Sequence, residues 1–311
     1  MQLPLNSVTA LSSERIVWVD IVRAAAILLI IGFHVAYEFT LDPNIRYIGY
    51  LGDSLFFIVS GYMLAQHYPK LKSFDLSWLW KRYVKVASLY YLTLIAIAVL
   101  FFSSQGWLAL GYDLLLHFTF MNWAVPGYLY TIISPAWFVI PLAVYYLLFP
   151  YLNRLLAWSK YTLVIIFLIT LAYRYYEGSW ASPNPLFFLG DFCFGIVFAQ
   201  DRKSLPLVSP LITVVLSPIM LIPYIAFYLI SLLEFFPKLM PAALGALFTL
   251  IGSYTYELFL FHESIMKTML GKWSVFGLAA APSLAVLLIV LAAVDHASRL
   301  IQRLLIPAAN G

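Results

Sequence analysis

One stretch near the amino terminus constrains the fold more than any other feature of the sequence. The apolar run 18–38 is long enough to cross a bilayer, yet it carries four ionisable residues, Asp20, Arg23, His34 and Glu38. A charge at membrane depth costs at least roughly 2.5–3.5 kcal/mol, so such residues are rarely without a role. On a helix the steps from Arg23 to His34 make three turns plus about 20°, and the two residues lie about 16 Å apart along the axis. One helix face is therefore polar, and it has to look into a protein interior or a water-filled cavity rather than into lipid.

The composition places the chain among integral membrane proteins. It has 311 residues, of which 63% are hydrophobic and 10% are charged, whereas an average soluble domain is about 25% charged. The lone cysteine, Cys193, excludes an intramolecular disulfide and a cysteine-based metal cluster, and no histidine–carboxylate spacing is typical of a zinc site. The pI is about 9.0, but no basic block with interleaved aromatic residues indicates a nucleic-acid partner. We expect no metal and no nucleic acid.

The apolar segments predict an all-α fold, a polytopic bundle of about ten transmembrane helices around a polar cavity. The expected spans are 16–39, 47–66, 84–103, 135–157, 161–176, 186–200, two short or broken helices within 206–236, then 241–263 and 276–304. The nearly uncharged connection 104–133 is expected to dip into the membrane or to form a lid. We expect one membrane domain over 1–311, with no cleavable signal and no fused extracytoplasmic domain.

Positive charge supports this count and sets the orientation. With ten spans and a cytoplasmic amino terminus, the outside holds only Arg46, Arg174, Lys267 and Lys272. The inside then holds Arg15, Lys70, Lys72, Lys81, Arg82, Lys85, Arg154, Lys160, Arg202, Lys203, Lys238, Arg299 and Arg303. With nine spans the last three boundaries change sides, and the excess of positive residues on the inside becomes smaller. We therefore expect residues 1–15 and the carboxyl terminus to lie in the cytoplasm.

Four short motifs follow one another along most of the chain. They are Trp18–His34, with an arginine eleven residues before a histidine, Gly52–Tyr62, the basic Lys81–Val86, and Gly252–His262. In this order they resemble the motifs of the acyltransferase-3 family of integral membrane acyltransferases, of the surface-glycan O-acetyltransferase type. Each motif alone is weak, but four in the right order are specific.

The sequence departs from this family pattern at a few positions. Ala24 stands where the family has a glycine, and Ser88 where a proline is common. Many members carry W-S-L-x-x-E in the fourth helix, whereas here the run is Trp137–Leu142 and Leu142 occupies the glutamate position. Some branches have a W-F-L version without the acid, so the resemblance stands. A mechanism that uses that glutamate is not open to this chain.

The resemblance implies O-acyl transfer, above all of acetyl from acetyl-CoA to a sugar hydroxyl of a cell-surface or exopolysaccharide or its lipid-linked precursor. Such transfer needs a base for the acceptor proton and a group that polarises the thioester. His34 is the expected general base, with Glu38 or Asp53 orienting its imidazole. Direct attack on the thioester and a transient acyl-histidine both stay open. Arg23 is expected to bind the donor, with Asp20 keeping it paired.

The remaining candidates each have a structural alternative. Donor or substrate binding is expected at Arg82, Lys85, Trp137, Tyr256 and His262. The structural alternative for the basic residues is a patch that sets topology and binds lipid headgroups. For His262 the alternative is a structural histidine at the membrane interface, and for Asp53 it is a helix N-cap. Gly61, after Ser60, favours close helix packing over donor contact, and His117 favours a surface loop.

Two other classes of function remain in competition with the enzyme. Broken helices in 206–236 and intramembrane charges are also typical of a secondary transporter of a glycan or lipid-linked intermediate, although no inverted repeat is visible. A structural subunit of a glycan-synthesis complex is the third alternative, and it would tolerate His34→Ala. For the enzyme, the expected partners are acyl-CoA, a glycan or lipid-linked sugar acceptor, membrane lipids and proteins of such a complex.

Overall fold

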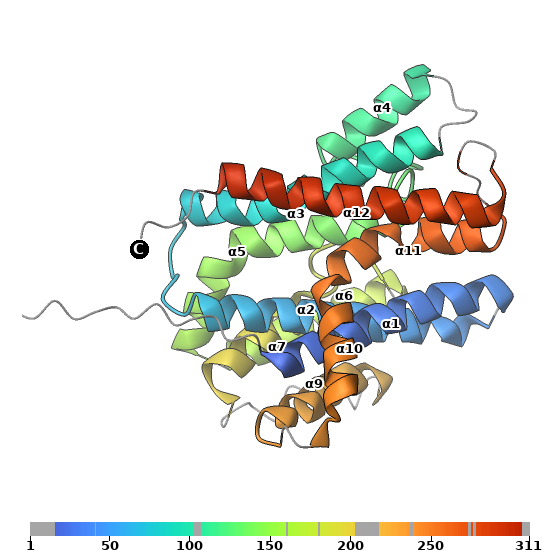
Figure 1. Ribbon diagram of the computed structural model, residues 1–311. Helices are drawn as coiled ribbons and strands as arrows, with labels where there is room; N and C mark the ends of the chain where they lie inside the picture. Colours follow the sequence, from blue (N-terminus) through green and yellow to red (C-terminus); the bar gives the residue numbers. More distant parts are fainter. Residues whose placement is uncertain are drawn as a thin grey trace, which may run out of the picture.

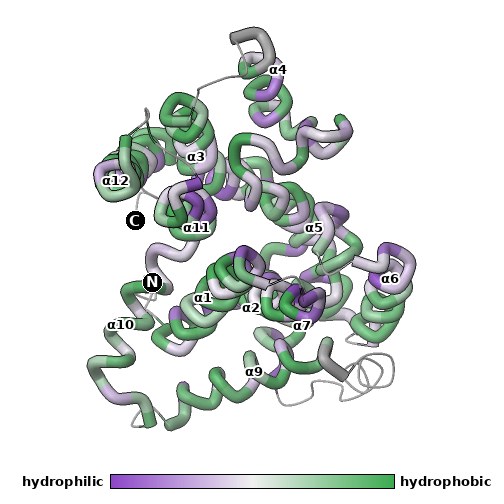
Figure 2. Tube along the Cα trace, turned by 90° about the vertical axis from the view of Figure 1, so that its right-hand side faces the viewer, coloured by the Kyte–Doolittle hydropathy of each residue, from purple (hydrophilic) through white to green (hydrophobic). Residues whose placement is uncertain are grey.

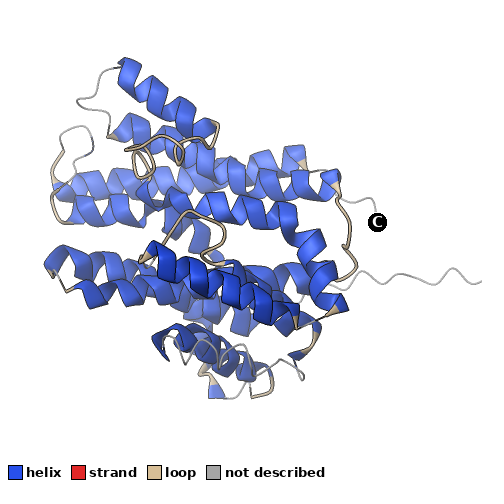
Figure 3. Ribbon diagram, turned by 180° about the vertical axis from the view of Figure 1, so that it is seen from behind, coloured by secondary structure: helices blue, strands red, loops and turns tan. Residues whose placement is uncertain are grey.

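The protein is built from helices. The computed structural model describes residues 16–40, 42–101, 107–159, 161–179, 181–202, 218–236, 239–272, 275 and 278–306. Helices make up 80% of it, and these ranges contain no strand (Figure 3), so the all-α prediction is confirmed. The helices are α1 (Val17–Phe39), α2 (Arg46–His67), α3 (Leu76–Leu100), α4 (Trp107–Phe118), α5 (Val139–Trp158), α6 (Thr162–Glu177), α7 (Leu189–Gln200), α9 (Ile222–Ser231), α10 (Ala242–Ser253), α11 (Thr255–Met269) and α12 (Ala280–Leu305).

The polar helix α1 lies inside the bundle. It packs against α2, α9, α10 and α11, while α7 covers the far side of α2. Figure 2 shows α1, α2 and α7 side by side, with α9 on one side of this row and α11 on the other. The first half of α1 is the more buried half, from Trp18 to Ile30. The side of α1 that carries Asp20 is therefore covered by protein, as the cost of a charge in lipid requires.

The long helices support a membrane protein, but the number of spans is lower than expected. In the described residues, five helices are long and apolar enough to cross a bilayer, namely α1, α2, α3, α5 and α12, and the bent pair α10–α11 makes up to six. A span needs roughly 20 residues, and α7 and α9 are shorter. The prediction of about ten spans is therefore not confirmed. The tail 1–15 and residues 206–217 of the expected broken segment lie outside the described residues.

Two expected spans have different boundaries in the structure. The span expected at 84–103 is α3, which begins at Leu76, where the Asp75 carboxylate accepts a hydrogen bond from the backbone N–H of Trp78 (3.0 Å). The span expected at 241–263 is two helices, α10 and α11, which meet at Tyr254 with a bend of 77°. This bend turns α11 alongside α1, so the late part of the chain reaches the polar helix.

Candidate active site

The first two residues of the polar face of α1 form an ion pair. Arg23 Nη1 lies 3.6 Å from Asp20 Oδ1. The aspartate side chain is 5% exposed and the arginine side chain 34% exposed. Asp20 thus sits where the sequence analysis places it, as the partner of Arg23, and the pairing reduces the cost of keeping both charges in the bundle.

The late motif packs directly on α1. Gly252, near the end of α10, approaches Asp20 so closely that a Cβ atom on it would lie 2.5 Å from the Asp20 backbone oxygen. After the bend, α11 runs along α1 and brings the imidazole of His262 to that of His34, with ring centroids 4.9 Å apart and planes tilted by 56°. We call His34 and His262 the histidine pair. Residues more than two hundred positions apart in the sequence therefore share one site.

Ionisable side chains surround the histidine pair. Glu263, Lys267 and Glu38 lie near enough to His34 to interact with it electrostatically. Glu263 pairs with Lys267 on α11, and the Glu38 carboxylate accepts a hydrogen bond from Lys272 Nζ, which joins the end of α1 to the segment after α11. In the described structure no hydrogen bond joins Glu38 to the His34 imidazole. Glu38 lies beside His34, but its carboxylate is directed to a lysine.

Asp53 lies elsewhere in the bundle. The neighbouring Gly52 packs on Ala26 and Ile30 of α1, whereas Asp53 is buried close to Asp191 of α7. Asp53 makes no hydrogen bond to His34 in the described residues. It is also well inside α2, which begins at Arg46, so the N-cap alternative is wrong.

The two arginines of the donor hypothesis converge on a tyrosine that the sequence analysis missed. Arg23 of α1 and Arg82 of α3 both lie near enough to the phenol of Tyr146, on α5, to interact with it electrostatically. Tyr256 of α11 lies close to the same phenol, and its own hydroxyl donates to the Val86 backbone oxygen at 3.2 Å. We call Arg23, Arg82, Tyr146 and Tyr256 the arginine–tyrosine cluster. It gathers side chains from α1, α3, α5 and α11.

Arg82 has hydrogen-bonding capacity left for a ligand. One of its nitrogens donates to the Tyr68 hydroxyl, and the guanidinium lies 4.8 Å from the Tyr68 ring centroid. No carboxylate among the described residues pairs with Arg82 or with Lys85, which is exposed on the same helix. A planar guanidinium without a carboxylate partner suits a phosphate or a carbonyl.

Trp137 packs among aromatic side chains. It belongs to the short 3-10 helix Ser134–Phe138 and packs among aromatic rings, with centroid distances of 6.0 Å to Phe138 and 6.2 Å to Phe188. Its surroundings are those of a packing residue. A role in substrate binding stays a prediction that these contacts do not favour.

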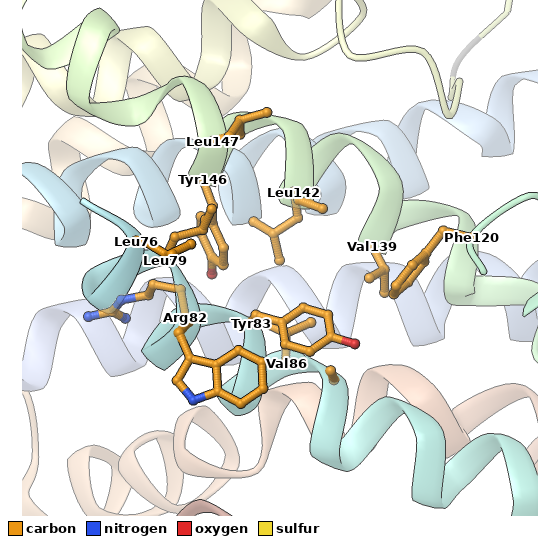
Figure 4. Close-up of a pocket in the computed structure, with 13 residues that line it drawn as sticks. Leu76, Leu79, Arg82, Tyr83, Val86, Phe120, Val139, Leu142, Tyr146 and Leu147 are labelled. Carbon is orange, nitrogen blue, oxygen red and sulfur yellow. The ribbon is translucent and has the colours of Figure 1, made fainter. Parts of the chain in front are cut away.

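An apolar groove of about 430 Å³ runs between α3 and α5. Arg82 lies at one end and Phe120 at the other, with Leu142, Tyr146 and Val86 between them (Figure 4). Leu142 is the position where many family members carry glutamate, and here it gives the groove an apolar wall.

Arg174, which the charge count placed on the outside, lies in a buried ion pair. Arg174 of α6 pairs with Asp191 of α7, and their side chains are 1% and 0% exposed. Arg174 therefore adds no free charge to the surface, because Asp191 neutralises its guanidinium inside the bundle. An arginine inside an apolar run is the signal that could have indicated this, although the run does not reveal the partner.

His117 is also buried rather than exposed. Its Nδ1 lies 2.9 Å from the Tyr90 hydroxyl and its Nε2 3.1 Å from Thr131 Oγ1, which also donates to Asp113. Burial lowers the pKa of His117, on the short helix α4, to about 4. The surface-loop prediction is therefore wrong. This hydrogen-bond network ties the connection after α4 to α3.

Fold and site together define an integral membrane protein with an ionisable face enclosed by its own helices. A model of a family described as an acyltransferase domain, the acyltransferase-3 family, matches residues 16–294. The chain belongs to this family, and the resemblance drawn from the four motifs is confirmed. It is a membrane acyltransferase. Searches of curated proteins and of solved structures find no match to the chain.

Proposed function

We propose that the protein is a membrane-embedded O-acyltransferase that moves acetyl from acetyl-CoA to a sugar hydroxyl of a cell-surface or exopolysaccharide or its lipid-linked precursor. The observation that carries this proposal is the packing of α11 along α1. It puts His262 on His34 toward one end of α1, while Arg23, toward the other end, and Arg82 each lie near enough to Tyr146 to interact with it. A base and one cationic donor contact thus share α1, and α3 adds the second cation.

The two groups of residues suit the two tasks of acyl transfer. The arginine–tyrosine cluster offers charged donors for the phosphates of acetyl-CoA. His34 is half-buried on α1 and can act either as a base on the acceptor hydroxyl or as a nucleophile toward the thioester. The carboxylates expected to orient its imidazole have other neighbours, so the orientation of the ring comes from packing against Phe33 and His262.

The arrangement of the helices supports a cytoplasmic donor. Figure 1 shows that α12 ends on the side of the bundle where α2 ends and α3 begins. This is the side of Lys81, Arg82 and Lys85, and positive residues favour the cytoplasm. We therefore place both termini and the donor on the cytoplasmic side of a bacterial inner membrane, with the acceptor approaching the histidine pair from the membrane or the outer side.

Purified protein in nanodiscs, supplied with radiolabelled acetyl-CoA and a crude membrane-glycan fraction, tests the function. We expect wild type to transfer label to glycan and His34→Ala to lose it by about 10²–10⁴-fold, the usual contribution of an acid–base group. Arg23→Ala should also fail, because it removes a donor contact and breaks the ion pair with Asp20. The matched control is His67→Ala, since His67 is an exposed histidine at the end of α2.

The outcomes separate the enzyme from its alternatives. If the His34→Ala protein still transfers label, this histidine has no catalytic role. If wild type shows neither transfer nor donor binding, a transporter function explains the enclosed charged residues better than an enzyme does.

Arg82 gives a separate prediction about the donor. Arg82→Gln should raise the KM for acetyl-CoA by roughly 10–100-fold with little change in kcat, because a hydrogen bond to a charged group contributes about 1.5–3 kcal/mol. Initial rates at varied donor concentration measure it. The control is Lys70→Gln, a change of an exposed cation in the link between α2 and α3. An unchanged KM in Arg82→Gln removes Arg82 from the donor site.

A further inference from the structure

His262 has one ring nitrogen bound and one left open. Its Nδ1 lies 2.8 Å from the Phe259 backbone oxygen. Because a carbonyl oxygen can only accept, Nδ1 carries the proton and the neutral ring keeps its lone pair on Nε2. That Nε2 atom is buried and has no hydrogen-bond partner among the described residues, although the residue is only 4% exposed. The local backbone therefore fixes His262 in the tautomer that can accept a proton at Nε2.

The open nitrogen belongs to a ring in contact with His34. The ring centroids lie 4.9 Å apart, but no hydrogen bond joins the two imidazoles within the described structure. A buried acceptor without a partner is unfavourable and calls for an explanation. A ligand hydroxyl at Nε2 would provide the missing donor, because it carries the one proton that an acyl acceptor has to lose.

We propose that His34 and His262 divide a double-displacement reaction, His34 carrying the acyl group and His262 Nε2 taking the proton of the acceptor hydroxyl. This inference rests on the proposed function. It chooses the acyl-histidine route over direct attack of the acceptor on the thioester. A histidine that carries an acyl group has used the lone pair that a base needs, so an acyl-histidine route requires a second base. His262 is in place for it, with its tautomer already set.

The steps balance in atoms and charge. In the first, a His34 ring nitrogen forms a bond to the thioester carbonyl carbon, the C–S bond breaks, and coenzyme A leaves as thiolate while His34 becomes an acyl-imidazolium. In the second, the acceptor oxygen forms the ester bond, its proton goes to His262 Nε2, and the C–N bond breaks, which returns His34 to neutral imidazole. The proton on His262 then passes, through solvent, to the coenzyme A thiolate.

The chain offers a matched pair of variants for the test. In His262→Asn the side-chain amide can replace Nδ1 as the donor to the Phe259 carbonyl, but no basic nitrogen remains at the Nε2 position. The control is His67→Asn, because His67 Nδ1 makes the same kind of bond, 2.8 Å to the Met63 backbone oxygen, on an exposed side chain. His262→Gln serves as a second variant if the asparagine protein does not fold, as judged by its thermal unfolding in nanodiscs.

The experiment is a rapid-quench measurement on the full chain with radiolabelled acetyl-CoA, in which coenzyme A release and label on protein and glycan are followed separately. Without acceptor, wild type, His67→Asn and His262→Asn should each release a burst approaching one coenzyme A per active site and retain label on His34, located by mass. With acceptor, His262→Asn should transfer about 10²–10⁴-fold more slowly than wild type. His34→Asn should show neither burst nor label.

Three results overturn the inference. Wild type that transfers acetyl without a burst uses direct attack. A His262→Asn protein that is folded and loses the burst together with transfer shows that the two histidines do not divide the steps, and one that transfers at the wild-type rate shows that His262 is not the base. A wild type that transfers nothing from acetyl-CoA overturns the proposed function itself, and this result is distinguishable because it precedes any comparison of variants.

Discussion

Replacing Arg174 by methionine should destabilise the protein by about 3–5 kcal/mol, the cost of leaving a buried charge without its partner. The guanidinium pairs with Asp191, and it donates to the Tyr50 hydroxyl and to the Phe187 backbone oxygen, each at 2.7 Å. The Tyr224 hydroxyl donates to the other Asp191 oxygen at 2.6 Å. One arginine thus connects α2, α6, α7 and α9. Thermal unfolding in one detergent, followed by intrinsic fluorescence, measures the loss.

The matched control is Arg299→Met, which breaks the Arg299–Asp295 pair on α12, where the arginine side chain is 51% exposed. An exposed pair of this kind contributes about 0–1 kcal/mol. The double variant Arg174→Met with Asp191→Leu should recover much of the loss, because replacing both members of a buried pair by apolar groups is often close to neutral. Equal losses in Arg174→Met and Arg299→Met would show that the buried network does not hold the helices together.

The membrane helices were predictable where hydrophobicity alone defines them. The spans expected at 16–39, 47–66 and 135–157 agree with α1, α2 and α5 within one or two residues at most ends. The start of α3 was missed because its first turns carry Trp80, Lys81 and Arg82 and extend beyond the apolar run. Asp75, three residues before the N–H that it caps, is the signal that could have located it. Hydropathy also gives no sign of the bend at Tyr254.

Part of the candidate site was predictable because it lies on one helix. The spacing of Asp20, Arg23 and His34 on α1 follows from helix geometry, and the ion pair of the first two agrees with it. His262 was a candidate because it belongs to the late motif. The motif does not tell that this residue packs against His34. Tyr146 was missed because nothing distinguishes one tyrosine of α5 from the many aromatic residues that line membrane helices. Contacts across α1, α3, α5 and α11 depend on how the helices pack, and single-helix periodicity carries no information about that.

Substituting alanine for Gly61 or for Gly195 should each destabilise the bundle by about 3 kcal/mol, at the upper end of the usual cost of overpacking. A Cβ atom on Gly61 would lie 2.0 Å from the Phe192 backbone oxygen, and one on Gly195 would lie 2.0 Å from the Ile58 backbone oxygen. Neither backbone can yield as a side chain could, so α2 and α7 would have to move apart. Small residues allow this approach of helix backbones in membranes, and the packing interpretation of Gly61 agrees with it. Thermal unfolding of each variant in nanodiscs measures the cost.

The two glycines face each other's helices, so their effects should not add. Once one methyl group has separated α2 from α7, the second meets less resistance, and the double variant should lose clearly less than the sum of the single losses. Gly111→Ala on α4 is the control, because a Cβ atom there would meet nothing within 4 Å and alanine generally improves a helix by about 0.5–1 kcal/mol. Additive losses would mean that the two sites act independently, and a loss in Gly111→Ala as large as in Gly61→Ala would mean that helix propensity rather than the α2–α7 contact sets the effect.

Because α7 also carries Asp191, separation of the two helices should weaken the Arg174 network at the same time, so combining Gly61→Ala with Arg174→Met should again cost less than the sum of the two.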